Sequence, residues 1–336
     1  MDLYQIDKYP AQREYPTQRI IYSDIYSDFE EHSGEKEQGI CPHLSCWDCC
    51  SFFTISLYSF ILCFGIGFFI SEIFSIDRRT FIMKRIAIYG KGGIGKSTTV
   101  CNIAAAMAQQ GLRVLQLGCD PKADSTSAHL NGEQQVTILD TVRAKGDNFE
   151  LSEIIREGTD GVLCAECGGP IPGSGCAGRG IVTAFDTLKA HNAYEVYKPD
   201  VLLYDVLGDV VCGGFAMPLR SGYARDVFIV TSGEKMALYA AANIAMAIDN
   251  FKGRNYARLS GLIQNSRNVK DETQLVAEMA EELSVPVAGL IPRDGLIQLA
   301  EEQNTTVVTA FPDSELSQTY HQLAKTLYEL AEEVDA

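Results

Sequence analysis

Two cysteines surrounded by glycines are the residues of this chain whose types and spacing most clearly suggest chemistry. Cys176 lies in GCAGRG (Gly175 to Gly180), and Cys212 lies in DVLGDVVCGGF. Thiolates bind soft metals and iron–sulfur clusters, but two of them cannot complete a site with four thiolate ligands. A two-fold dimer supplies four, because each subunit contributes the same two residues. The pattern predicts one [4Fe–4S] cluster shared by two identical subunits.

A glycine-rich stretch indicates a second kind of chemistry, the binding of phosphate groups. GKGGIGKS fits the pattern G-x-x-x-x-G-K-[ST] between a predicted strand and a predicted helix. Backbone N–H groups of such a loop turn toward phosphate oxygens, and the helix N-terminus adds its positive end. Lys96 is expected to reach the β- and γ-phosphates and the Ser97 hydroxyl to ligate Mg²⁺. The predicted ligand is MgATP, bound by Gly90, Lys91, Gly92, Gly93, Ile94, Gly95, Lys96, Ser97 and Thr98.

Two aspartate-containing loops follow predicted strands. GCDPKADST carries Asp120 and Asp124, and YDVLGD carries Asp205 and Asp209. An aspartate at a strand end beside a P-loop holds Mg²⁺ or orients the attacking water. Asp205 fits the Walker-B position, and the other three are placed to sense the γ-phosphate. Aspartates also cap helices and form turns, but two such loops beside a P-loop favour a nucleotide-dependent switch.

Alternating strands and helices are expected to position these loops. Apolar runs rich in β-branched residues occur at 85–89, 112–117, 201–206, 226–230, 259–263 and 286–291. Helical spacing occurs at 96–110, 235–251 and 271–283. The alternation predicts an α/β fold with a mostly parallel, doubly wound sheet, as in P-loop NTPases. Ligands then bind at the carboxyl ends of the strands.

Residues 1–82 differ in composition from the rest of the chain. They contain an uncharged run of nineteen residues from Phe52 to Ile70, long enough for a membrane-spanning helix. The alternative is that this segment is not normally made. Met83 directly precedes the first predicted strand, and Arg78-Arg79 can be encoded by AGGAGG, a bacterial ribosome-binding sequence. We predict that translation starts at Met83, that 83–336 is the P-loop ATPase and [4Fe–4S] domain, and that 1–82 is an upstream extension.

The intact mass of the natively expressed protein tests this start site. We expect a polypeptide that begins at Met83, because the codons of Arg78-Arg79 can form a ribosome-binding sequence three codons before it. A chain that begins at Met1 would contradict the prediction and favour the membrane anchor.

Charge and cysteine content narrow the functional classes. The formal net charge of −16 disfavours non-specific nucleic-acid binding and favours a soluble, cytoplasmic protein. Eleven cysteines without a cleavable signal or a regular disulfide framework favour metal binding or redox chemistry. Neither nucleic acid nor a membrane is therefore an expected partner of residues 83–336.

Together the motifs resemble those of the nitrogenase iron protein and of nitrogenase-like reductases, among the deviant P-loop ATPases. The matching stretches are YGKGGIGKSTT, GCDPKADST, GGPIPGSGCAGRG, YDVLGDVVCGGFAMP, NSRN and PRD…Q..AE. The match begins at about Lys84 and runs almost to the C-terminus. The resemblance implies a homodimer that couples MgATP hydrolysis to the transfer of one electron from its bridging cluster to a larger catalytic component. Ferredoxin or flavodoxin would be the electron source.

The resemblance also implies roles for residues at the cluster and at the nucleotide phosphates. Cys176 and Cys212 would be the cluster ligands, one cluster per dimer, with Arg179 on the docking face beside it. Lys91 would reach across the dimer to the partner's nucleotide. Further implied positions are Asp124 near Mg²⁺, Asp120 and Asp209 in hydrolysis, Asp205 opening the switch toward the cluster, and Asn265, Asp294, Gln298 and Glu301 near adenine and ribose.

Departures from the family pattern leave the partner open. Gln264 stands where a cysteine is usual before NSRN, the cluster-ligand spacing is one residue longer, and the usual C-terminal extension is missing after HQLAKTLYELAEEVDA. These features fit a reductase for a tetrapyrrole- or thioether-reducing partner about as well as one for nitrogen fixation, although GCAGRG is nitrogenase-like. Cys167 replaces a usual serine, and no second metal site with Cys164 is expected.

A hypothesis of a different class is a partition- or septum-type ATPase, which is a positioning switch without redox chemistry. Such a protein would share the P-loop and both aspartate loops. It would not need two cysteines embedded in glycines, so the presence or absence of an iron–sulfur cluster distinguishes the two hypotheses.

Overall fold

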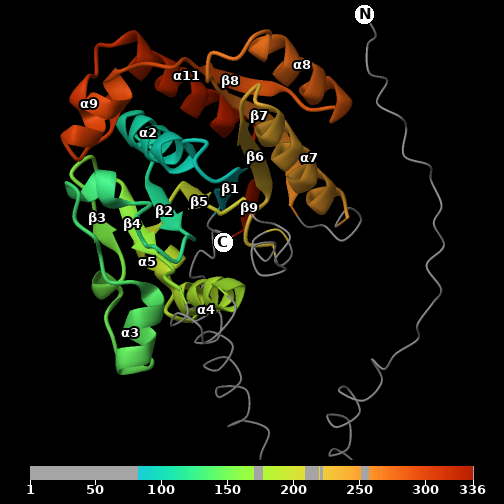
Figure 1. Cartoon of the computed structure of the whole chain (residues 1–336). Helices are drawn as coiled ribbons and strands as arrows, with labels where there is room; N and C mark the ends of the chain where they lie inside the picture. Colours follow the sequence, from blue (N-terminus) through green and yellow to red (C-terminus); the bar gives the residue numbers. More distant parts are fainter. Residues whose placement is uncertain (1–81, 170–176, 209–218, 220–221, 251–256, 336) are drawn as a thin grey trace, which may run out of the picture. The chain divides into compact units, whose positions relative to one another are not determined.

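Nine strands form one mostly parallel sheet in the described part of the chain (Figure 1). The computed structural model describes residues 82–169, 177–208, 219, 222–250 and 257–335. The chain divides into two units, 1–75 and 76–336, and every described residue belongs to the second. The strands are β1 (Ile82–Gly90), β2 (Val114–Gly118), β3 (Arg156–Glu157), β4 (Leu163–Glu166), β5 (Val201–Asp205), β6 (Asp226–Thr231), β7 (Arg258–Asn265), β8 (Val287–Ile291) and β9 (Glu333–Asp335).

The strand order is β3-β4-β2-β5-β1-β6-β7-β8, so β1 lies inside the sheet between β5 and β6. β9 pairs antiparallel with the first residues of β1, beyond the end of the β1–β6 pairing. Only this pair and β3–β4 are antiparallel among the described strands. The order reverses direction at β1, and such a reversal places a ligand crevice at the carboxyl ends of the strands.

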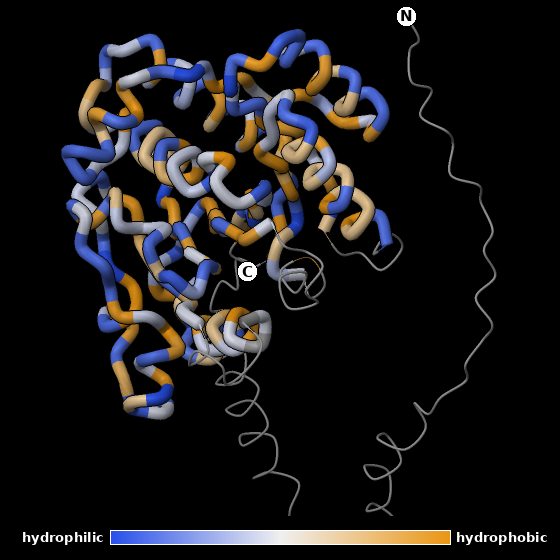
Figure 2. Tube along the Cα trace, in the orientation of Figure 1, coloured by the Kyte–Doolittle hydropathy of each residue, from blue (hydrophilic) through white to orange (hydrophobic). Residues whose placement is uncertain are grey.

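Helices cover both faces of the sheet, and each face has its own buried hydrophobic cluster. Helices α2, α9, α10 and α11 contribute to one cluster and α3, α4, α5 and α8 to the other, while α7 contributes residues to both. Figure 2 shows hydrophobic residues along the central strands and a mixture of hydrophobic and hydrophilic residues along the helices. The helices are α2 (Lys96–Gln109), α3 (Ile138–Lys145), α4 (Ala177–Ala190), α5 (Ala193–Tyr197), α7 (Lys235–Asp249), α8 (Glu272–Glu282), α9 (Leu296–Glu302), α10 (Val307–Ala310) and α11 (Glu315–Leu330), with 3-10 turns η1 (Ser127–Leu130) and η2 (Leu151–Glu153).

The predicted doubly wound α/β fold is confirmed, and all six predicted strands and all three predicted helices are present. The short strands β3, β4 and β9 were not predicted. β4 ends in a charged residue, Glu166, and β9 contains two acidic residues, so neither segment has the continuous apolar pattern of the other strands. No helix within the described ranges is long and apolar enough to span a membrane.

Register brings the ends of three strands together. Asp205 at the end of β5 lies opposite Ile88 of β1 and opposite Gly118 at the end of β2. The P-loop follows β1, the GCDPKADST loop follows β2, and the YDVLGD loop follows β5. Parallel pairing therefore places all three loops at one edge of the sheet.

Candidate functional site

The P-loop turns through two glycines with left-handed backbone angles. Gly93 has φ 74° and Gly95 has φ 90°, backbone angles that residues other than glycine adopt only at an energetic cost. Two side chains from the end of β7 hold the loop's carbonyl groups: Asn265 Nδ2 donates to Ile94 O at 2.6 Å, and Arg267 Nη2 donates to Gly93 O at 2.9 Å. These carbonyl oxygens are paired within the protein and do not compete with a phosphate for the loop's N–H groups. Sequence reasoning missed Arg267, although it belongs to the NSRN motif.

The P-loop lysine is paired with the aspartate at the end of β5. Lys96 Nζ forms an ion pair with Asp205 Oδ1, and Ser125 Oγ donates to Asp205 Oδ2 at 2.6 Å. All three residues are buried. Buried charges need close partners, because an unpaired one costs several kcal/mol, on the order of 3–5. Asp205 therefore connects the P-loop to Ser125 of the GCDPKADST loop.

The YDVLGD loop packs directly on the backbone of the P-loop. The Val206 amide donates to Ile88 O at 3.0 Å, which continues the β1–β5 pairing by one residue. At Gly208 an added Cβ would lie 2.1 Å from the Gly90 carbonyl oxygen and 3.3 Å from the Lys91 amide nitrogen. Only glycine fits at position 208 because the P-loop backbone lies against it. A movement of either loop therefore requires the other loop to shift.

The GCDPKADST loop forms a tight turn that exposes the side chain of Asp124. The Ala123 amide donates to Asp120 O at 3.0 Å, and Ala123 has φ 52°. Lys122 Nζ lies 3.5 Å from Asp120 and 3.8 Å from Asp124. The carboxylates of Asp120 and Asp124 raise the pKa of the Lys122 ammonium. Asp124 is 48% exposed, so its carboxylate is accessible to a cation from solvent.

Glu166 fastens the far end of this loop and was not found from the sequence. Its Oε1 accepts from the Thr126 amide at 2.8 Å and from Thr126 Oγ1 at 2.7 Å. The side chain is fully buried, and Oε2 has no hydrogen-bond partner among the described residues. Burial raises the pKa of Glu166 to about 7; the Thr126 hydrogen bonds oppose this shift, and the nearby charges of Asp205 and Asp124 add to it. A short strand with one acidic residue carries no sequence signal for such a role.

Glu166 predicts a specific dependence of stability on pH. Its pKa is raised in the folded protein, so its contribution to stability is complete below the unfolded value of about 4.5 and is lost as pH rises through about 7. Between those values the free energy of unfolding should fall by up to about 1.4 kcal/mol per pH unit because of this group. Denaturant unfolding of the wild type and of Glu166→Gln measures the difference. Equal slopes in both proteins would show that Glu166 does not retain its proton.

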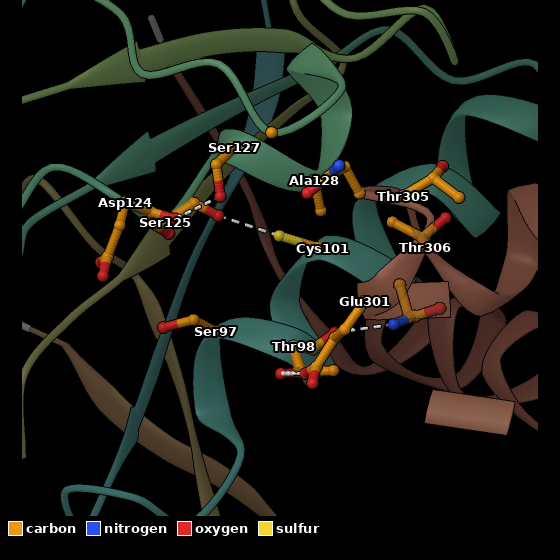
Figure 3. A pocket seen from close by; sticks show the side chains of 13 residues that line it. Ser97, Thr98, Cys101, Asp124, Ser125, Ser127, Ala128, Glu301, Thr305 and Thr306 are labelled. Carbon is orange, nitrogen blue, oxygen red and sulfur yellow. Dashed lines mark hydrogen bonds between the residues drawn. The ribbon is translucent and has the colours of Figure 1, made fainter. Parts of the chain in front are cut away.

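A cavity of about 300 Å³ brings several of the predicted site residues together (Figure 3). Ser97 and Thr98 line it from the start of α2, Asp124 from the GCDPKADST loop and Glu301 from α9. Thr98 Oγ1 donates to Glu301 Oε1 at 3.2 Å. Several hydroxyls, two carboxylates and a helix N-terminus around one cavity can hold a hydrated divalent cation or polar groups of a nucleotide.

Other predicted nucleotide residues lie elsewhere at this edge of the sheet. Asn265 contacts the P-loop, as described above, and Lys91 is half-buried within it. Asp294 Oδ1 accepts from the Leu296 amide at 2.8 Å at the start of α9, and Gln298 is exposed on that helix. Neither Asp294 nor Gln298 lines the cavity.

The cluster-ligand prediction falls outside the described residues. Cys176, Cys212 and Asp209 lie in undescribed segments, and so does the side chain of Arg179, whose backbone belongs to the first turn of α4. Within the described ranges no three His, Cys, Asp or Glu side chains are grouped as a metal site.

The remaining cysteines near the site are buried in the core. Cys164 and Cys167 belong to different hydrophobic clusters, on opposite faces of the sheet. Cys167 Sγ instead lies 3.9 Å from Cys119 Sγ. Burial raises the pKa of the Cys119 thiol well above its usual value, so it remains a neutral thiol.

Comparison with known proteins agrees with this geometry. Residues 84–335 match the family model described as 4Fe-4S iron sulfur cluster binding proteins, NifH/frxC family. The chain belongs to the NifH/frxC family. The predicted family is thus confirmed. This chain is 51% identical over 248 residues to a nitrogenase iron protein of Methanospirillum hungatei, and the match covers 73% of this chain and 88% of the relative. It is 49% identical over 259 residues to nitrogenase iron protein 2 of Methanothermococcus thermolithotrophicus, covering 74% and 89%.

Solved structures of more distant proteins share the fold of this NifH/frxC family member. The septum site-determining protein MinD of Pyrococcus horikoshii, complexed with Mg-ADP, has a TM-score of 0.56 at 20% identity and covers 73% of this chain and 96% of its own. A ParA family ATPase of Chlorobium tepidum also has a TM-score of 0.56 at 20% identity, covering 73% and 99%. At this identity the likeness establishes the mostly parallel P-loop ATPase fold alone.

Proposed function

We propose that this chain is the ATP-dependent reductase component of a nitrogenase, acting as a homodimer that transfers single electrons to a larger catalytic component. Its membership of a 4Fe-4S family and its identity of about half to proteins named nitrogenase iron protein support this function. The observation that carries the proposal is the match of residues 84–335 to the 4Fe-4S family model. In the structure, Asp205 contacts both Lys96 and Ser125. One side chain thereby joins the phosphate-binding loop to the two loops that can respond to it.

The residues of the nucleotide site are suited to MgATP. Lys96 and the P-loop amides would bind the phosphates, and Ser97 and Asp124 would hold Mg²⁺ or its waters. Lys96 leaves Asp205 when it pairs with phosphate oxygens, so Asp205 and Ser125 lose the charge that holds them in the present arrangement. Asp205 begins the loop that leads to Cys212 seven residues later. Release of Asp205 is therefore transmitted to the cluster-binding segment along a short length of chain.

The cluster would be held by Cys176 and Cys212 of each subunit, and it supplies one-electron redox chemistry when bound. Lys91, at the start of the P-loop, would reach the partner's nucleotide, and Asp120 and Asp209 would orient the attacking water. Arg179 would lie on the surface that docks the catalytic component. A ferredoxin or flavodoxin would reduce the cluster again after each transfer. Residues 83–336 would suffice for all of these functions.

Anaerobic purification of the full chain tests the proposal. We expect a dimer with about four iron atoms, the visible absorbance of an iron–sulfur cluster, and bleaching on reduction. With a methanogen nitrogenase catalytic component, electron transfer should require MgATP. A monomer that stays iron-free after reconstitution would overturn the redox function in favour of a nucleotide switch alone. An intact dimer that does not reduce this component would overturn only the choice of nitrogenase as partner.

A further inference from the structure

A row of six polar side chains connects a loop before β4 with the P-loop, and none of the six is more than 8% exposed. The row runs through Asp160, His129, Gln116, Ser125, Asp205 and Lys96. His129 Nδ1 lies 2.6 Å from Asp160 Oδ2, and His129 Nε2 lies 2.9 Å from Gln116 Oε1. Gln116 Nε2 lies 3.0 Å from Ser125 O and 3.3 Å from Ser125 Oγ. The row thus connects Asp160, in the loop before β4, to Lys96 of the P-loop through hydrogen bonds and ion pairs.

The chemistry of each contact defines the direction of the hydrogen bonds. The Ser125 carbonyl oxygen only accepts, so the Gln116 atom that faces it is the amide nitrogen. The Gln116 oxygen therefore faces His129, and since it only accepts as well, His129 Nε2 carries a hydrogen. His129 Nδ1 faces the Asp160 carboxylate. Two acceptors on opposite sides of one imidazole favour the doubly protonated, charged ring.

The surroundings of His129 agree with this protonation state. Burial lowers the pKa of His129, but the nearby Cys101 and Asp160 outweigh burial and raise it to about 10. The loop that carries Asp160 is closely fitted around the histidine: Thr159 N donates to His129 O at 3.0 Å, and a Cβ at Gly158 would lie 2.7 Å from His129 Cβ. The ion pair is therefore rigidly placed.

Ser125 is held from two sides by this arrangement. Its hydroxyl donates to Asp205, while its carbonyl oxygen accepts from Gln116 and, at 2.9 Å, from Cys101 Sγ. Ser125 directly follows Asp124, which lines the candidate nucleotide cavity. A rigid anchor on the carbonyl side fixes where the Ser125 hydroxyl can lie, and so stabilises Asp205 in its contact with Lys96.

We propose that His129, Asp160 and Gln116 are positioning residues that anchor Ser125 and thereby make the release of Asp205 from Lys96 more costly when nucleotide binds. This inference rests on the proposed nucleotide switch. The anchor stabilises the nucleotide-free arrangement selectively, because Gln116 binds Ser125 in the GCDPKADST loop, which must move when Asp205 leaves Lys96. Weakening it should favour the state that binds nucleotide, since affinity rises when the competent state becomes more populated.

Gln116→Met tests the anchor, because it keeps the side-chain length but removes both the donor to Ser125 and the acceptor of His129. In the full-length anaerobic dimer we expect Kd for MgATP, measured by equilibrium binding without the catalytic component, to fall by about threefold or more. Amide hydrogen exchange at residues 120–126 should rise by about tenfold relative to the P-loop amides. Thr141→Val is the matched control: Thr141 is buried in α3 and donates to the carbonyl oxygen of Thr137, which caps that helix, away from the switch. It should lower the melting temperature without changing either readout.

Asp160→Asn provides a second variant that keeps the shape of the anchor and removes the counter-charge of His129. It should change both readouts in the same direction, and it decides the question alone if Gln116→Met does not fold. Unchanged Kd for MgATP and unchanged exchange at 120–126 in a folded variant would overturn the proposal. Both readouts concern nucleotide binding only, so failure of electron transfer in the wild-type protein would count against the proposed function and not against this anchor.

Discussion

Gly208→Ala is expected to abolish tight MgATP binding. The added Cβ would lie 2.1 Å from the Gly90 carbonyl oxygen and 2.7 Å from the Gly90 carbonyl carbon, both of them backbone atoms that no side-chain rotation can move away. Either the P-loop or the YDVLGD loop must shift, and the P-loop binds phosphate through backbone groups whose positions are critical. We expect Kd for MgATP to rise at least about a hundredfold, with a loss of about 1–3 kcal/mol of stability typical of overpacking. Equilibrium nucleotide binding and denaturant unfolding measure the two effects.

Gly295→Ala is the matched control for the glycine-to-alanine change. At Gly295 a new Cβ meets no atom within 4 Å, and φ is −71°. Alanine is compatible with that backbone conformation and should leave stability equal or slightly raised, by about 0.4–1 kcal/mol. If Gly208→Ala bound MgATP as tightly as the wild type, the packing of the YDVLGD loop on the P-loop would not be required for nucleotide binding.

Cys212→Ser is expected to remove the iron–sulfur cluster and leave a folded, nucleotide-binding protein. Serine is a poor ligand for iron compared with a thiolate, and one substitution per subunit removes two of the four ligands from a site shared by a dimer. Described residues form the nine-stranded sheet and its two hydrophobic clusters without Cys212, so loss of the iron–sulfur cluster should not unfold them. Iron content should fall to background, and Kd for MgATP should change by less than about tenfold.

Cys164→Ala is the control for this experiment, because Cys164 is a cysteine buried in the hydrophobic core and is not a predicted cluster ligand. It should retain the iron content of the wild type. Normal iron in Cys212→Ser, measured beside this control, would refute the assignment of Cys212 as a ligand.

Local motifs were sufficient to locate the P-loop in the sequence. The pattern from Gly90 to Ser97 identifies a P-loop because its chemistry depends on backbone geometry that only consecutive residues can provide. Most of the six strands were predictable for a related reason: β2, β5, β6 and nearly all of β1 are buried on both faces and read as apolar runs, and that signal needs no knowledge of their neighbours. The family was also predictable, because the cysteines lie in distinctive glycine-rich motifs.

Only the tertiary structure decided which side chains of the site contact one another. Lys96 and Asp205 are 109 residues apart, and Ser125 and Asp205 are 80 apart, so their contacts depend on which strands are neighbours in the sheet. Glu166 and His129 follow no periodic pattern, and their burial beside specific donors and acceptors arises from packing between distant segments. Sequence patterns specify elements and backbone-built sites because these are local; side-chain networks depend on the register of nonconsecutive strands, which the sequence encodes only through the whole fold.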